Sequence, residues 1–135
     1  MRVQLPHSYD SITSVDNLLT AWQEFKRGKR TRKDVQHFEM NLSDNILSLH
    51  QDLASRHYRH GPYQSFHITD PKPRHIHKAS VRDRVLHHAV YRQLYPFFDR
   101  TFISRSFSCR DDKGTHKALN VFRSYGRAVS QNHTR

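Results

Sequence analysis

The sequence predicts an α+β domain that is mostly helical, with about four helices and one β-hairpin. Two observations support this fold class. Apolar residues recur at helical spacing in four separate stretches, and a segment between the second and third stretch alternates apolar with polar residues around a proline-rich turn. We expect residues 1–135 to form a single domain, which opens with an irregular lead-in at residues 1–13 where no periodicity is found.

The composition of the 135-residue chain favours a polyanionic partner. Its net charge is +11 and its pI is about 10.3, a balance typical of proteins that bind nucleic acid and, second, of those that bind anionic membrane surfaces. Only 35% of the residues are hydrophobic, against roughly 45–50% apolar in an average domain. This is low for a self-sufficient unit, so part of the surface is expected to face a neighbouring segment.

Cysteine usage and hydropathy exclude other classes. Cys109 is the single cysteine, which excludes an internal disulfide framework and a zinc site built from several cysteines. No apolar run is long enough to cross a bilayer. The chain is therefore predicted to be cytoplasmic and to have no membrane partner.

The first helix is predicted to begin at Thr13 or Ser14, either of which can cap it, and to end near Phe25. Trp22 belongs to its apolar stripe and is interpreted as a core residue rather than a base-stacking platform. Residues 26–33 follow as a basic cluster, with six basic residues out of eight. The cluster is either an array for phosphates or a solvated connector, and the residues alone do not decide between them. Its basic residues are Lys26, Arg27, Lys29, Arg30, Arg32 and Lys33.

The second helix is predicted as one continuous element over residues 34–57. Its apolar residues step by four, four, three and four positions, which is typical of an amphipathic helix with a core-facing stripe. These residues are Phe38, Leu42, Ile46, Leu49 and Leu53.

A β-hairpin is predicted over residues 63–78. Residues 63–69 are read as a half-buried strand, since Phe66 and Ile68 alternate with polar residues; residues 70–73 form a turn with two prolines, and residues 74–78 return. Ile76 faces one side of the returning strand, with His75 and His77 on the other.

Two basic residues lie at or near the tip of this hairpin. Lys72 supplies a mobile point charge and Arg74 a planar guanidinium, which are complementary ways to hold phosphate oxygens.

The third helix is predicted to begin at Ser80, with Asp83 three residues later as in a capping box, and to stop before Pro96. Three phenylalanines follow as an aromatic patch that we expect to be core: Phe97, Phe98 and Phe102. Residues 102–114 are expected to be an irregular basic loop. A last helix is predicted over residues 115–129, with Ala118, Leu119, Phe122 and Val129 on one face.

Common catalytic arrangements are not found in the sequence. There is no glycine-rich phosphate loop, and Asp111 and Asp112 are adjacent in a loop, so their carboxylates point apart. His75 and His77 lie two apart on a strand and could share one metal ion, but a zinc site takes three or four ligands. A metal-dependent, nuclease-like enzyme using these two histidines is the third and weakest interpretation.

From Asn17 onward, four ordered segments together resemble the N-terminal part of bacterial reverse transcriptases of the group II intron and diversity-generating retroelement kind. They are NLLTAWQEFKRGKR (residues 17–30), HGPYQSFHITDPKPRHI (60–76), SVRDRVLHHAVYRQLYPFF (80–98) and SFSCRDDKGTHKAL (106–119). The resemblance implies the fingers region of such an enzyme, without its palm.

The resemblance also implies roles for basic residues. Lys72 and Arg74 would grip the triphosphate of the incoming nucleotide. Arg82 and Arg84 would lie beside the template path. Arg110, in the segment from Ser106 to Gly114, would lie near the template strand, and Lys113 is grouped with it as a nucleic-acid contact.

This sequence departs from the family in one respect that limits its chemistry. The family's metal-binding aspartates belong to the palm, and Asp111-Asp112 belongs to the loop motif instead. The resemblance therefore implies a fragment that is inactive alone and holds no cofactor, with Mg²⁺ needed only by the complete polymerase. Its partners would be an RNA or DNA template, a nucleotide triphosphate and a palm and thumb segment. The alternative is a stand-alone RNA- or DNA-binding module without polymerase chemistry.

Overall fold

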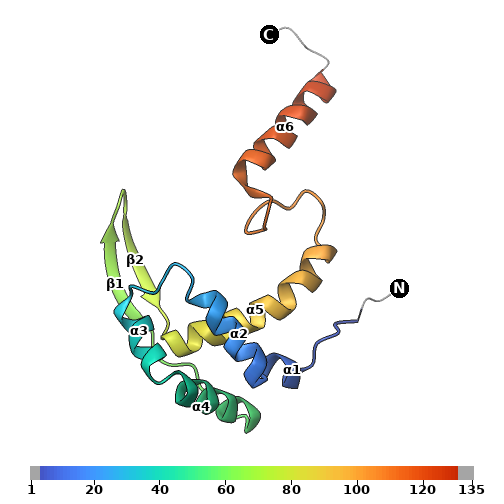
Figure 1. Ribbon diagram of the computed structural model, residues 1–135. Coiled ribbons are helices and arrows are strands. Elements are labelled where there is room, and N and C mark those ends of the chain that lie inside the picture. Colours follow the sequence, from blue (N-terminus) through green and yellow to red (C-terminus); the bar gives the residue numbers. More distant parts are fainter. Residues whose placement is uncertain (1–3, 131–135) are drawn as a thin grey trace. The chain divides into compact units, whose positions relative to one another are not determined.

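The computed structural model describes residues 4–130, which fold into a helix-rich α+β structure with one two-stranded antiparallel sheet (Figure 1). The predicted α+β class, mostly helical with one β-hairpin, is confirmed, although the described residues form six helices rather than about four. That this is a fingers region stays a prediction. The described chain divides into two compact units, one ending at Tyr95 and one beginning at Pro96. Its elements are α1 (Tyr9–Thr13), α2 (Val15–Phe25), α3 (Lys33–Met40), α4 (Leu42–Ala54), β1 (Gln64–Thr69), β2 (Pro73–Lys78), α5 (Val81–Thr101) and α6 (Gly114–Ser130).

The expected irregular lead-in at residues 1–13 is wrong in its second half, because α1 forms there; residues 1–3 lie outside the described residues. Ser8 and Ser11 make a reciprocal capping box. The Ser8 hydroxyl accepts the Ser11 N–H at 3.1 Å, and the Ser11 hydroxyl accepts the Ser8 N–H at 3.0 Å. Local polar contacts, rather than apolar periodicity, start this helix.

Helix α2 confirms the first predicted helix and carries the centre of the core. Ser14 caps it by accepting the Asn17 N–H at 3.2 Å. Trp22 is fully buried, with its ring centroid 5.0 Å from that of Phe38 and 6.1 Å from that of Phe25. The interpretation of Trp22 as a core residue is confirmed.

The single helix predicted over residues 34–57 is wrong, because α3 and α4 are separate. The break is at Asn41, whose backbone leaves the helical region with φ −120° and ψ 42°. The Asn45 side-chain amide donates to the Phe38 carbonyl at 2.9 Å, which satisfies a group at the end of α3. The apolar stripe runs through the break, since Phe38, Ile46 and Leu49 all lie in one core, and this is why its spacing concealed two helices.

Helix α5 does not stop before Pro96, so that expected boundary is also wrong. It continues to Thr101, with Pro96 inside it. Proline removes one backbone hydrogen bond but leaves the turns on either side intact, and here the two compact units divide at this residue. Before it, α5 adds Val85 and Ala89, both fully buried, to the core.

The second unit has the predicted irregular loop and last helix, but its expected apolar core is not formed. Phe98 and Phe102 are 44% and 46% exposed, and α6 has no buried residue. The apolar face of α6 is open to solvent, with Phe122 and Val129 the most exposed. A correct helical period thus predicted the element without predicting its burial.

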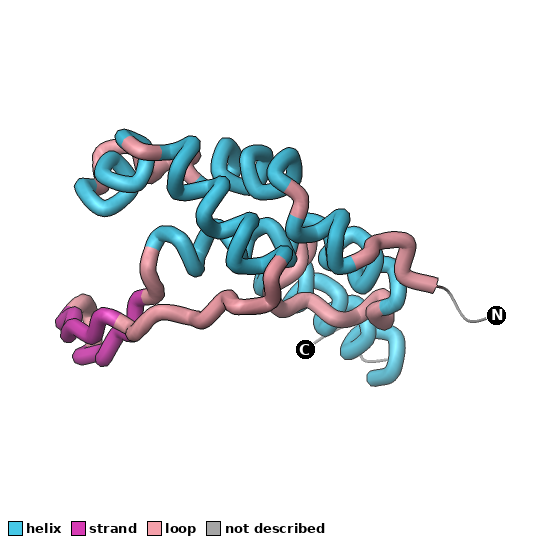
Figure 2. Tube along the Cα trace, turned by 90° about the horizontal axis from the view of Figure 1, so that it is seen from below, coloured by secondary structure: helices cyan, strands magenta, loops and turns pink. Residues whose placement is uncertain are grey.

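The hairpin is formed where predicted, but it is not half-buried. Every residue of β1 is exposed, including Phe66 and Ile68, because the strands extend beyond the helices of the described first unit (Figure 2). None of the helices in residues 4–130 is both long and apolar enough to span a membrane.

Candidate nucleic-acid interface

The register of the hairpin separates two faces. Phe66 pairs with Ile76 and His67 pairs with His75, so apolar side chains lie on one face and histidines on the other. This agrees with the alternation predicted for the second strand.

The tip of the hairpin carries Lys72 and Arg74. Lys72 lies in the turn after the cis Asp70–Pro71 peptide bond, and Arg74 is the second residue of β2. Both are exposed, and neither side chain has a hydrogen bond or ion pair to any residue in the described part of the chain. The tip therefore carries two exposed cationic side chains that are not paired within the described residues.

Asp34 fixes the base of the hairpin. Its carboxylate accepts from Lys78 of β2 at 2.6 Å and from Arg84 of α5 at 2.7 Å. Burial alone would raise the pKa of Asp34, but hydrogen bonds from these two cations outweigh it and hold the pKa below its ordinary value. One carboxylate at the start of α3 thus joins the sheet to two helices.

Arg82 is also paired with a carboxylate. Its guanidinium donates to Asp52 of α4 and lies 5.4 Å from the centre of the Tyr58 ring. The two arginines expected beside the template, Arg82 and Arg84, therefore both hold α5 against other helices. Their contact with nucleic acid stays a prediction.

Asp83 has a larger structural role than the helix cap that sequence reasoning assigned to it. Its side chain is buried and accepts from Tyr58 Oη at 2.6 Å, Gly61 N at 3.1 Å and Ser80 Oγ at 2.6 Å. Burial would raise the pKa of Asp83, but these hydrogen bonds lower it below its ordinary value; burial and Asp83 together raise the pKa of Tyr58.

The contacts of Asp83 position the hairpin. Tyr58 and Gly61 belong to the segment that leads into β1, so Asp83 holds this segment against the start of α5. The predicted capping box is half correct: the Asp83 N–H donates to Ser80 Oγ at 3.1 Å, while the Asp83 carboxylate accepts from the Ser80 hydroxyl rather than from the Ser80 backbone N–H. Only the three-residue spacing of Ser80 and Asp83 hinted at this site.

The basic cluster of residues 26–33 has mixed roles. Lys26 forms an ion pair with Glu39 at 2.9 Å, and Lys29 donates to the Phe25 carbonyl at 2.9 Å. Gly28 has a φ of 69°, which glycine adopts without strain as the chain leaves α2. The remaining four cations are exposed and have no partner side chain among residues 4–130: Arg27, Arg30, Arg32 and Lys33. The cluster ends beside Asp34, and so beside the base of the hairpin.

Arg110 and Lys113 hold the loop of the second unit. Arg110 donates to the Asp99 carboxylate at 2.7 Å and to the carbonyls of Ile103 and Ser106 at 3.1 Å. Lys113 Nζ donates to the Ser104 carbonyl at 2.8 Å. These contacts give both residues a structural role within the loop, and their proposed nucleic-acid contacts stay predictions.

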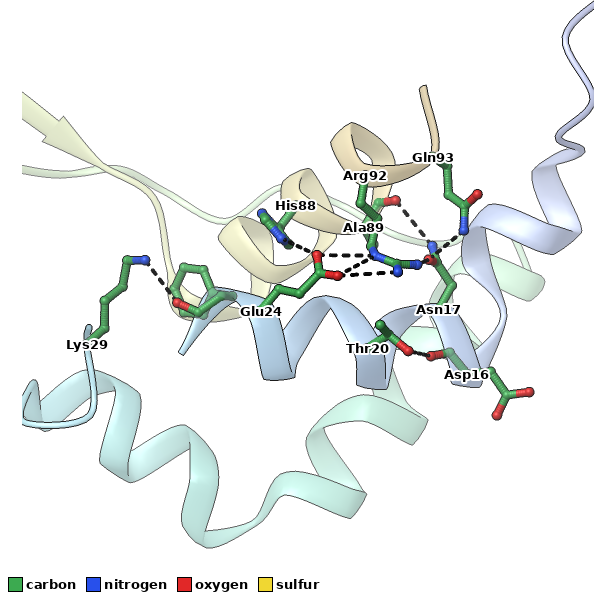
Figure 3. A network of polar contacts seen from close by, with 10 residues as sticks. Asp16, Asn17, Thr20, Glu24, Lys29, His88, Ala89, Arg92 and Gln93 are labelled. Carbon is green, nitrogen blue, oxygen red and sulfur yellow. Dashed lines mark hydrogen bonds and ion pairs between the residues drawn. The ribbon is translucent and has the colours of Figure 1, made fainter. Parts of the chain in front are cut away.

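A polar network between α2 and α5 was not predicted (Figure 3). Glu24 accepts from His88 at 2.9 Å and from Arg92 at 3.3 Å, and Asn17 accepts from Gln93 at 2.8 Å. The hydrogen bond from His88 is the largest cause that lowers the pKa of Glu24. The hydrogen-bonded residues are 64 to 76 positions apart in sequence. No short sequence pattern marks such pairs, and the network was therefore not predicted.

Metal binding finds no support in the geometry. Across residues 4–130, no group of three or more histidine, cysteine, aspartate or glutamate side chains is placed to hold a metal ion. Among these residues, His75 and His77 have no third ligand beside them of the kind that a zinc site needs.

The arrangement brings together an exposed cationic tip, a fixed base and four further exposed cations beside that base. Comparison with known proteins adds no relative: no protein-family model matches the chain, and no curated protein matches it.

Proposed function

We propose that the chain is the fingers portion of an RNA-directed DNA polymerase, which binds template nucleic acid and positions the triphosphate of the incoming nucleotide. The observation that carries the proposal is the hairpin tip, where Lys72 and Arg74 are exposed and form no hydrogen bond or ion pair with the described residues. A point charge and a planar guanidinium two residues apart in sequence suit the oxygens of a phosphate chain.

The fixed base of the hairpin supports this role. Asp34 and Asp83 tie β2 and the segment before β1 to the helices, so the tip is held by a braced ribbon rather than a free loop. The sequence segments that resemble reverse transcriptases include Asp83 and its partner Gly61, whereas Asp34 lies outside them. In this proposal the chain acts in the cytoplasm, where RNA is present.

The exposed apolar face of α6 supports the proposal that a further segment packs against this helix in the complete polymerase. Phe122 is 74% exposed and Val129 83% exposed, and no residue of α6 is buried. In the proposed polymerase, a palm segment covers this face and supplies the carboxylates for Mg²⁺. The chain alone is then inactive, because it contributes phosphate binding and no metal site.

The second candidate is a stand-alone RNA- or DNA-binding module. The observation that favours it is the group of exposed cations beside Asp34, since phosphate binding by Arg27, Arg30, Arg32 and Lys33 needs no polymerase chemistry. Reading the gene downstream of Arg135 for a palm segment with an Asp-Asp box separates the two: its presence favours the polymerase, and its absence in every frame favours the module.

Salt-dependent binding of a labelled single-stranded RNA tests both candidates. The logarithm of the affinity should fall linearly with the logarithm of the salt concentration, with a slope of about −0.7 for each phosphate contact. In the Lys72→Ala/Arg74→Ala variant the slope should become shallower by about 1.4, since two contacts are lost. The matched control, Arg123→Ala/Arg127→Ala, removes the same charge from α6 and should keep the wild-type slope. A flat slope for the wild type would contradict both candidates.

Nucleotide kinetics of a complete polymerase that contains this segment distinguish the polymerase proposal from the stand-alone module. Replacing Lys72 and Arg74 there should raise the nucleotide KM or lower kcat, because the triphosphate loses two ligands. If neither constant changes, the assignment to the triphosphate is wrong, and RNA binding by the same residues would then support the module.

A further inference from the structure

The face of the hairpin opposite Phe66 and Ile76 carries three histidines in direct ring contact. The rings of His67 and His75 are stacked, with centroids 4.4 Å apart and planes 6° apart, and the ring of His77 lies 4.3 Å from that of His75. All three residues are exposed. We name them the histidine strip.

The row of rings continues from the strip to the helices. Tyr63 lies 6.5 Å from His77, His60 lies 4.9 Å from Tyr63, and His87 of α5 stacks on His60 at 5.3 Å. A row of aromatic rings, five imidazoles and the phenol of Tyr63, therefore leads from the hairpin to the start of α5.

The surroundings of the strip contain little negative charge. Its polar neighbour is Ser65, whose hydroxyl lies 2.9 Å from His77 Nδ1. The carboxylate of Asp83 lies 3.9 Å from His60. The ring of Tyr63 stands between His60 and His77. Asp70 and Lys72 lie in the turn, and the register places Arg74 and Lys78 on the other face. Among residues 4–130, no carboxylate is paired with any ring of the strip.

This arrangement couples protonation to the arrival of an anion. Imidazole is the side chain whose charge changes between about pH 5 and pH 8. Two protonated rings about 4 Å apart repel each other, and a phosphate group against both rings offsets that repulsion. By linkage, binding of the anion then takes up protons, and its affinity rises as the pH falls.

We propose that the histidine strip is a second phosphate-binding surface, for the backbone of single-stranded RNA, that engages when its imidazoles are protonated. A row of imidazoles along a ribbon matches a chain of phosphates better than it matches one small anion. The proposal rests on the proposed function, because it assigns a second surface for the nucleic acid held by Lys72 and Arg74.

The test is fluorescence anisotropy of a labelled single-stranded RNA at constant ionic strength, from about pH 8 to about pH 6. The strip variant is His67→Gln/His75→Gln/His77→Gln. The matched control is His37→Gln/His57→Gln/His116→Gln, which removes three exposed histidines outside the hairpin. Circular dichroism at both pH values shows that each variant is folded.

We expect the wild type and the control to bind RNA about tenfold more tightly at the lower pH, and the strip variant to lose most of that gain while keeping its affinity near pH 8. The slope of log Kd against pH counts the protons taken up, and it should fall in the strip variant alone. A gain that survives in the strip variant, or no gain in the wild type, would overturn the inference.

The proposed function fails in a different way. If the wild type does not bind RNA near pH 8, or if Lys72→Ala/Arg74→Ala binds as well as the wild type there, the tip is not the RNA site. Vesicles containing phosphatidylserine provide one further arm: pH-dependent binding to them that exceeds binding to RNA would assign the strip to a membrane surface and overturn the inference.

Discussion

The helices and the hairpin of the first unit are built in opposite ways. The helices bury a continuous apolar core around Trp22, whereas the hairpin has no buried residue in either strand and is held by polar contacts at its base. Most of the stability therefore resides in the helices. The side chains of the hairpin remain exposed, and substitutions in the two regions should have separable effects on stability.

The largest loss of stability is expected in the core. Trp22→Ala removes a fully buried aromatic side chain and should lower the free energy of unfolding by about 4 kcal/mol. Chemical denaturation followed by circular dichroism measures the change. The exposed Leu119→Ala serves as the control, with an expected change within about 0.5 kcal/mol. Equal losses in the two variants would remove the contrast between buried and exposed regions.

A smaller loss is expected at the contact that joins the two regions. Asp83→Asn replaces a buried carboxylate that accepts from Tyr58, Gly61 and Ser80, and should cost about 2 kcal/mol. Exposed Asp44→Asn is the control. Urea denaturation near neutral pH should give a clearly lower free energy of unfolding for Asp83→Asn than for Asp44→Asn.

The same variant should change the pH dependence of stability. The pKa of Asp83 in the folded state lies below its ordinary value of 3.8, so its stabilising contribution is fully present above that value and is lost as the pH falls through the lower folded pKa. The wild type should therefore lose stability in this acidic range more steeply than Asp83→Asn. Identical pH profiles would show that the carboxylate is not held as the structure indicates.

A local effect is expected at the base of the hairpin. Asp34→Asn weakens the ion pairs with Lys78 and Arg84, which should cost about 1 kcal/mol. Amide hydrogen exchange should become faster in β1 and β2 and stay unchanged at Leu18 and Leu49 in the core. Faster exchange throughout the first unit would mean that the hairpin and the helices open together.

The smallest effect is expected on the apolar face of the hairpin. Phe66→Thr keeps a strand-forming residue and removes a ring that is 39% exposed, so the free energy of unfolding should change by less than about 0.5 kcal/mol. A melting curve compared with that of the wild type measures it. A loss as large as that of a core residue would show that another element covers this face in solution.

The sequence predicted elements better than it predicted their burial. Helical spacing located α2 and α6, and the prolines and alternation located the hairpin. Burial of Phe66 and Phe102 was expected and is absent, because periodicity identifies an apolar face but not the element that covers it. The break at Asn41 escaped notice because α3 and α4 turn the same stripe toward one core.

For the proposed site, the sequence identified the cations and missed the carboxylates that hold the hairpin. Lys72 and Arg74 are visible as basic residues next to prolines, and the structure leaves them exposed. The carboxylates that brace the ribbon, Asp34 and Asp83, take partners 22 to 50 residues away in sequence, and such pairs have no local pattern. Arg82 and Arg84 show the same limit, since their ion pairs appear only once the helices are packed.

The central claim is that the hairpin tip binds phosphate without contributing to stability. One preparation of Lys72→Ala/Arg74→Ala tests both halves, by a thermal melt and by titration with labelled single-stranded RNA at low salt. We expect a melting temperature equal to that of the wild type and an RNA affinity lower by about tenfold. An unchanged RNA affinity in a variant with the wild-type melting temperature would contradict the claim.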